Sequence, residues 1–252
     1  MERVVTLGRR VLPRGWRDFG LQLVIWFGFY FSYLAVREVT YRGDTAKAFV
    51  NALRVISLEQ RVSHHLYELT VERVADSSSL LLTAAAWTYW NSEFTVIGLA
   101  LLWVYLRRHD GFTRFRNTIL LANVVGLVGF TVMPTAPPWM FPYMGFVAGV
   151  NHSSALLQTL ANPYAAMPSL HAADALIVGW FLVSTSRTVW AKVLWALWPV
   201  WVWFCVIATA NHYLLDVVAG IGVAVVSLLA IVWMPRVFAR LRGLGPVIAN
   251  LL

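Results

Sequence analysis

Residues 193–216 read VLWALWPVWVWFCVIATANHYLLD, an apolar run from Val193 to Ala210 that is followed at once by His212 and Asp216. As a helix, the run is long enough to cross most of a hydrocarbon layer of ~30 Å. An ionisable side chain at membrane depth is costly, so its presence indicates a functional site. The stretch therefore predicts a membrane helix that ends beside a reactive site.

The composition places the whole chain in a membrane. Of its 252 residues, 59% are hydrophobic and 13% are charged, and 13 are tryptophans. These values lie outside the usual range for a soluble domain. We predict an all-α, polytopic membrane protein: one integral domain over residues 1–252, built as a six-transmembrane-helix bundle. The predicted spans are 19–36, 94–106, 119–133, 170–185, 193–210 and 213–234.

Basic residues orient this bundle, because short cytoplasmic loops are enriched in Lys and Arg. We expect residues 134–168, which contain neither, to face outwards, and both termini to face the cytoplasm from a plasma (inner) membrane. Topology and contact with anionic lipid then explain the formal charge of +8, and no nucleic-acid partner is expected. The basic residues are Arg3, Arg9, Arg10, Arg14 and Arg17 in the N-terminal tail, Arg107, Arg108, Arg114 and Arg116 after the second span, Arg187 and Lys192 after the fourth, and Arg236, Arg240 and Arg242 in the C-terminal tail.

The segment 37–79 is predicted to be an outward-facing amphipathic element. Residues 46–61 fit a helix with Phe49, Leu53 and Ile56 on one side. Lys47, Arg54 and Arg61 recur at sevens, which keeps them nearly on one face. Two interpretations stay open: these cations reach lipid phosphates at the membrane surface, or they contact the phosphate of a substrate.

Two histidines and an aspartate carry the chemistry. His171 opens the fourth span and His212 the sixth, so both lie at helix N-termini, which favour phosphate. Asp216 follows His212 by four residues, so on a helix it can accept a hydrogen bond from one imidazole nitrogen and leave the other nucleophilic. His171 can protonate the leaving oxygen. The set predicts phosphoryl transfer through a phosphohistidine, without a metal or other cofactor.

The motifs around these residues carry a family resemblance. The sequences MPSLH at 167–171 and HYLLDVVAG at 212–220 resemble the second and third signatures of the type 2 phosphatidic acid phosphatase superfamily. With APPW at 136–139, they are most similar to the branch of fungal inositol phosphorylceramide synthases and their bacterial relatives. The resemblance covers residues 119–234, the expected catalytic core helices. It implies that His212 is the nucleophile, Asp216 its orienting group, His171 the general acid and Ser169 a phosphate ligand.

The chain departs from the phosphatase branch in its cations. That branch carries a Lys and an Arg-Pro in its first signature and a Ser-Arg pair ahead of the third. Here residues 134–139 hold no cation, and Cys205-Val206 stands where the Ser-Arg pair would be. This favours transfer of a phospho-headgroup from a phospholipid donor to an alcohol or lipid acceptor. A phosphatase acting on a lipid phosphate or polyprenyl pyrophosphate remains the alternative. Arg54 and Arg61 are candidate replacement cations, and Trp139 a candidate cover of the site.

Other interpretations stay open. Asp174, within the fourth span, either lines the site as a substrate-binding group or makes a structural hydrogen bond. His171, Asp174, His212 and Asp216 could also bind zinc in a membrane hydrolase, or relay protons in a transporter. Glu93 is expected near a helix end, within reach of the membrane surface. The oligomeric state is not predicted, and membrane lipids are the expected partners.

Overall fold

The computed structural model describes residues 12–41, 45–152 and 162–241. These ranges form helices and connecting loops without a named β-strand, which confirms the all-α prediction. The helices are α2 (Gly15–Tyr41), α3 (Thr45–Ser63), α4 (Tyr67–Asp76), α5 (Ser79–Asn91), the π-helical turn η1 (Ser92–Val96), α6 (Ile97–Arg107), α7 (His109–Val132), the 3-10 turns η2 (Pro138–Met140) and η3 (Pro142–Met144), α9 (Leu170–Thr185), α10 (Val189–Ala208) and α11 (Leu214–Leu241).

Four of the described helices are long and apolar enough to cross a membrane: α2, over Gly15–Glu38, α7, α10 and α11. The six-span count is therefore not confirmed. Each of the six predicted spans does coincide with a helix, but α9 has only 16 residues. The second span falls on the 11 residues of α6, which continue backwards through η1 into α5.

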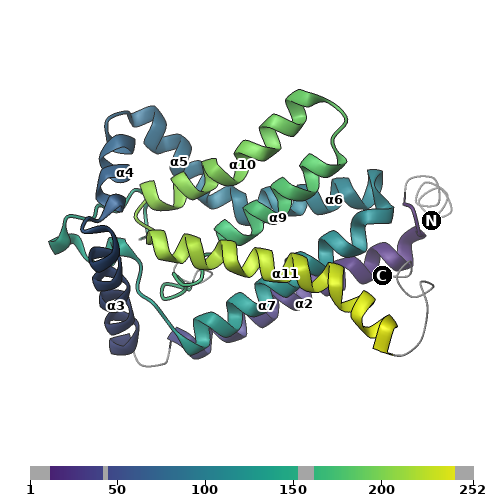
Figure 1. The fold of residues 1–252 in the computed structure, drawn as a ribbon, viewed down its shortest axis with the longest axis horizontal. Helices are drawn as coiled ribbons and strands as arrows, with labels where there is room; N and C mark the ends of the chain where they lie inside the picture. Colours follow the sequence, from purple (N-terminus) through teal and green to yellow (C-terminus); the bar gives the residue numbers. More distant parts are fainter. Residues whose placement is uncertain (1–11, 42–44, 153–161, 242–252) are drawn as a thin grey trace.

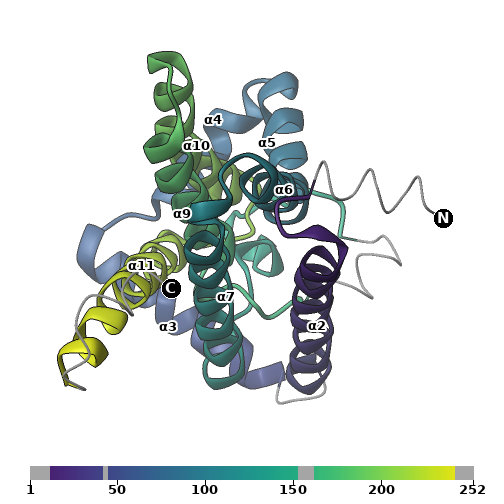
Figure 2. The same cartoon turned by 90° about the vertical axis from the view of Figure 1, so that its right-hand side faces the viewer.

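Helix α9 lies at the centre of the bundle, against α7, α10 and α11 (Figure 1). Its small residues allow close approach: a Cβ added at Gly179 would lie 2.7 Å from the carbonyl oxygen of Trp195 on α10. Figure 2 shows α2 to one side of the other long helices. A hydroxyl of α6 ties it there, because Tyr105 Oη donates to Asp18 Oδ2 at 2.8 Å.

The two ends of the bundle differ. Helices α3 and α4 lie at one end, and the α6–α7 and α9–α10 turns lie towards the other (Figure 1). Arg107, Arg108 and Arg187 are at or beside those two turns. Arg114 and Arg116 were expected in a loop but lie inside α7, because Arg108 alone separates α6 from α7. The basic residues at 1–11 and Arg242 lie outside the described residues.

Helix α3 runs across the end of the bundle, as Figure 1 shows. It buries a stripe of mostly small residues against the loop that follows α7, including Phe141 and Phe146. Of the three apolar residues expected on one face, Ile56 is buried and Leu53 is 42% exposed. Leu53 lies outside the buried face because the loop approaches α3 closely, so that alanines rather than bulky side chains fill the contact. The buried residues of α3 are Ala48, Asn51, Ala52, Val55, Ile56 and Glu59.

Candidate active site

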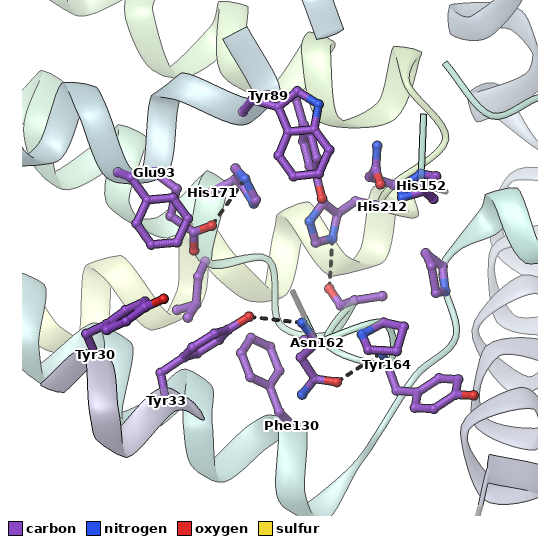
Figure 3. Close-up of a pocket in the computed structure, with 18 of the residues that line it drawn as sticks. Tyr30, Tyr33, Tyr89, Glu93, Phe130, His152, Asn162, Tyr164, His171 and His212 are labelled. Atoms are coloured by element: carbon purple, nitrogen blue, oxygen red, sulfur yellow. Dashed lines mark hydrogen bonds and ion pairs between the residues drawn. The ribbon is translucent and has the colours of Figure 1, made fainter. Parts of the chain in front are cut away.

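A cavity of about 720 Å³ opens between α2, the α5–η1 junction, the start of α9 and the loops that precede α9 and α11 (Figure 3). It contains both predicted histidines, and most of its wall is aromatic. None of the described residues that line it is a Lys or an Arg. The lining residues are Trp26, Phe27, Tyr30, Tyr33, Tyr89, Trp90, Glu93, Phe94, Phe130, Pro137, Trp139, His152, Asn162, Pro163, Tyr164, Ala165, Ala166, Leu170, His171, Asn211 and His212.

His212 lies in the tight turn between α10 and α11, not on the helix. Its Nδ1 is 2.8 Å from the carbonyl oxygen of Ala166, as Figure 3 shows. A carbonyl can only accept, so Nδ1 carries the proton and Nε2 is the unprotonated nitrogen. Burial lowers the pKa of His212 from 6.5 to about 4. The imidazole is therefore neutral near pH 7, the form that a nucleophile requires.

Asp216 does not make the hydrogen bond expected of it. Its Oδ2 is 3.6 Å from His212 Nδ1, too far for a hydrogen bond, and accepts from the backbone N–H of Tyr213 at 2.9 Å. This is the reach-back half of a capping box at the start of α11. The expectation assumed that the helix already includes His212, whereas α11 begins at Leu214. The carbonyl of Ala166 orients the imidazole instead.

Two glutamates, from α3 and α4, complete this helix start. Glu68 Oε1 accepts from the N–H of Leu214 and Glu59 Oε1 from that of Leu215, both at 2.7 Å. Burial and then the adjacent Glu68 carboxyl raise the pKa of Glu59 to about 9, so Glu59 is protonated near pH 7. The expectation that the N-terminus of α11 offers these N–H groups to a phosphate is therefore wrong, because the carboxyl groups of Asp216, Glu68 and Glu59 already accept from the N–H groups of Tyr213, Leu214 and Leu215.

Ser169 caps α9 and does not line the cavity. Its Oγ accepts from the N–H of Ala172 at 3.3 Å, and its side chain is fully buried. Its own N–H donates to the carbonyl oxygen of Asp216 at 3.0 Å. This bond joins the starts of α9 and α11 and brings the ring centres of His171 and His212 to 5.6 Å. Ser169 therefore fixes the start of α9 relative to α11, and it is not placed to bind a phosphate in the cavity as expected.

His171 has two neighbours that the sequence did not indicate. Its Nε2 is 3.4 Å from Glu93 Oε2, and the ring of Tyr89 stacks on it at 4.6 Å and 17°. Glu93 was expected near a helix end, within reach of the membrane surface. It lies instead in η1, within a continuous helical stretch, and lines the cavity. An acidic residue next to an apolar run was the available signal.

Asp174 makes the structural hydrogen bond that was one of its two interpretations. Both of its carboxylate oxygens accept from Asn123 Nδ2, at 3.0 and 2.9 Å, and it does not line the cavity. The four residues considered as zinc ligands therefore do not meet at one point, because Asp174 lies outside the cavity that contains the two histidines. Within the described ranges, no group of three or more His, Cys, Asp or Glu residues is placed to hold a metal ion.

Of the three other residues expected to bind substrate, one lines the cavity and two do not. Trp139 lines the cavity and stacks on His152 at 4.1 Å and 13°. Arg54 and Arg61 lie on the exposed side of α3 and do not line it. Arg54 Nη1 donates to Asn51 Oδ1 at 3.4 Å. The two arginines are therefore not placed to replace the missing cations in this cavity.

Comparison with known proteins agrees with the motifs. Residues 53–230 match the family model of the PAP2 superfamily. The chain belongs to the PAP2 superfamily. It is also 26% identical over 156 residues to phosphoinositol dihydroceramide synthase of Bacteroides thetaiotaomicron, an alignment that covers 55% of this chain and 50% of that relative. The chain thus spans about half the length of this curated relative. No solved structure matches it significantly.

Membership of the PAP2 superfamily confirms the resemblance drawn from the motifs at His171 and His212. This membership agrees with the expectation of an enzyme of the phosphatase and phosphotransferase type, and the aligned relative is named as a synthase. The apolar helices, together with this family, identify it as an integral membrane protein.

Proposed function

We propose that this PAP2 enzyme is a lipid phosphotransferase that works through a phosphohistidine at His212. The observation that carries the proposal is the hydrogen bond from His212 Nδ1 to the carbonyl of Ala166. It fixes the tautomer in which Nε2 is free to attack, on a ring that lines the same cavity as His171. A positioned base, nucleophile and acid within one cavity is the arrangement expected for covalent catalysis.

The reaction has two halves. His212 Nε2 attacks the phosphorus of the donor, the bond from phosphorus to the leaving alcohol breaks with its electron pair on oxygen, and His171 gives that oxygen a proton. The acceptor alcohol then attacks the phosphohistidine and loses its proton to His171. The bond from phosphorus to nitrogen breaks, and its electron pair returns to His212. The enzyme ends in its starting state.

Three features favour an alcohol over water as the acceptor. The cavity has the volume of a site that encloses a ligand, and its aromatic wall reduces the access of water to the intermediate. The described lining has no Lys or Arg to hold a free phosphate dianion. The aligned relative is named as a synthase. We infer transfer of a phospho-headgroup from a phospholipid to an alcohol or lipid acceptor, at the outer leaflet.

The test is to give purified protein in nanodiscs a headgroup-labelled phospholipid donor, with and without an alcohol acceptor. We expect little release of labelled headgroup phosphate until the acceptor is added. Trp139→Ala should raise hydrolysis relative to transfer, because Trp139 closes one side of the cavity. Trp190→Ala, at a side chain that is 84% exposed on α10, is the matched control and should leave the ratio unchanged.

The opposite result would identify a phosphatase. In that case the enzyme would release inorganic phosphate rapidly from a lipid monophosphate or a polyprenyl pyrophosphate, whether or not an acceptor is present. Comparison of lipid extracts from cells with and without the gene then identifies the natural product, because the product of a transferase disappears when the gene is deleted.

A further inference from the structure

Glu93 owes its position to a local change of helix type. Residues Ser92–Val96 form a π-helical turn between α5 and α6. One such turn inserts an extra residue into an otherwise α-helical stretch. Since each α-helical residue turns by about 100°, the insertion changes which side chains face the bundle interior. π turns of this kind occur often at functional sites.

The environment of Glu93 is unusual for a carboxylate. It is the only acidic residue among the described residues that line the cavity, and no Lys or Arg is among them. Its side chain is 24% exposed and that of His171 is 11% exposed. A carboxylate in such a site needs a positive partner. Oε2 points at His171 Nε2, at 3.4 Å (Figure 3).

His171 is confined on a second side. The Tyr89 ring lies nearly parallel to it, with ring centres 4.6 Å apart. Tyr89 belongs to α5 and Glu93 to η1, so one continuous helical stretch supplies both the stacking surface and the carboxylate. This stretch precedes both histidine motifs in the chain. The stacked ring and the carboxylate beside His171 therefore come from outside the motifs.

We propose that Glu93 is a positioning residue that orients His171 as the general acid of the phosphoryl-transfer reaction and stabilises its protonated form. This inference rests on the proposed function. Glu93 would act on His171 as the carbonyl of Ala166 acts on His212, by accepting from one ring nitrogen, but its negative charge stabilises the imidazolium more strongly than a neutral carbonyl does. It is burial that keeps His212 neutral. The two histidines of the cavity thus have different partners, a carboxylate at His171 and a backbone carbonyl at His212.

The role predicts a dependence on the leaving group. When the bond from phosphorus to oxygen breaks, an alkoxide needs the proton of His171, whereas p-nitrophenolate leaves as a stable anion and does not. Removing the support of the acid should therefore slow only the reaction that needs the proton. General acid catalysis typically contributes about 10²–10⁴-fold to the rate of such a step.

The experiment compares a natural phospholipid donor with its p-nitrophenyl phosphodiester analogue, which carries the same headgroup. For Glu93→Gln we expect kcat on the phospholipid to fall by about 10²-fold, and kcat on the p-nitrophenyl donor by less than about tenfold. KM should change little for either donor. Glu93→Asp keeps the charge on a shorter side chain and should restore part of the lost rate.

Glu72→Gln is the matched control, because Glu72 is a buried carboxyl that accepts from the N–H of Val147 and does not line the cavity. It should not change the ratio of the two rates. If Glu93→Gln lowers both rates by the same factor, or neither, Glu93 has no role in acid catalysis. Failure of the proposed function looks different: His212→Ala would then keep full activity on both donors.

Discussion

In the proposed mechanism, a backbone carbonyl selects the nitrogen of His212 that attacks. The oxygen of Ala166 accepts from Nδ1, and it comes from the loop that leads into the His171 motif. Each histidine motif therefore supports the other: Ala166 orients His212, and the carbonyl oxygen of Asp216 accepts from the N–H of Ser169, two residues before His171. A shift of either loop would misplace both rings.

The neutral state of His212 predicts the acid side of the pH profile. Since burial lowers its pKa to about 4, His212 stays unprotonated, and able to attack, as pH falls from 7 to about 5. We expect kcat/KM for a phosphodiester donor, which does not titrate in this range, not to decline there and to fall only as pH approaches 4. Returning the samples to pH 7 before a second assay controls for unfolding. An acid limb centred near pH 6.5 would mean that His212 is solvated and not buried.

The motifs predicted two histidines that the structure brings together in one cavity, but not how these histidines are held. The pair His171 and His212 and the cavity residue Trp139 could be predicted because they lie in motifs. The partner of each histidine could not: Ala166 acts through its backbone, which any residue provides, and Glu93 is turned inward by a π turn that has no sequence pattern of its own. Spacing was misleading for Asp216, because the helix starts two residues after His212.

The distance between His171 and His212 depends on the contact between α9 and α11, because the two histidines lie at the starts of these helices. At Gly220 the two helices meet so closely that an added Cβ would collide with the carbonyl oxygen of Ser169. Two residues along the same helix, Gly222 has no heavy atom within 4 Å of the Cβ position. The two glycines therefore form a matched pair for testing this contact.

We expect Gly220→Ala to destabilise the protein by about 1–3 kcal/mol and to lower activity, because it pushes α11 away from the start of α9. Gly222→Ala should be neutral or stabilising by up to about 1 kcal/mol. Thermal unfolding in detergent and turnover of the phospholipid donor measure the two effects. Equal behaviour of the two variants would contradict the close packing described at Gly220.

The positions of the helices could be predicted from the sequence more accurately than the contacts between them. The six apolar runs all fall on helices, because a membrane requires continuous apolar helical segments. Their ends were less accurate: α7 begins early enough to include Arg114 and Arg116, where Arg116 donates to Gln22 on α2. The role of α3 and α4 could not be predicted either, because Glu59 and Glu68 cap a helix about 150 residues later in the chain.

At the scale of the whole molecule, the cavity and the basic turns lie towards opposite ends. Helices α3 and α4 close the end where α11 begins, and the turns with Arg108 and Arg187 lie away from it (Figure 1). Because basic loops stay in the cytoplasm, this separation predicts that the cavity faces the outer leaflet.

Single cysteines test this orientation. In a Cys205→Ala background, which removes the buried native thiol, we expect Tyr143→Cys to react with an impermeant thiol reagent in intact cells. Tyr143 is 73% exposed in the loop after α7. Arg187→Cys, in the exposed α9–α10 turn, should react only after the cells are opened. The reverse pattern would place the reaction at the cytoplasmic leaflet.

Detection of a covalent intermediate tests most directly whether the reaction passes through a phosphohistidine at His212. Purified enzyme is mixed with a headgroup-labelled phospholipid without acceptor, quenched within milliseconds in alkali, where phosphohistidine is stable, and digested for mass spectrometry. Transfer through a phosphohistidine predicts the mass of the phospho-headgroup on His212, its loss when an alcohol acceptor is added before the quench, and no adduct in His212→Ala. Turnover of the donor without any adduct, or with the adduct on another residue, would contradict it.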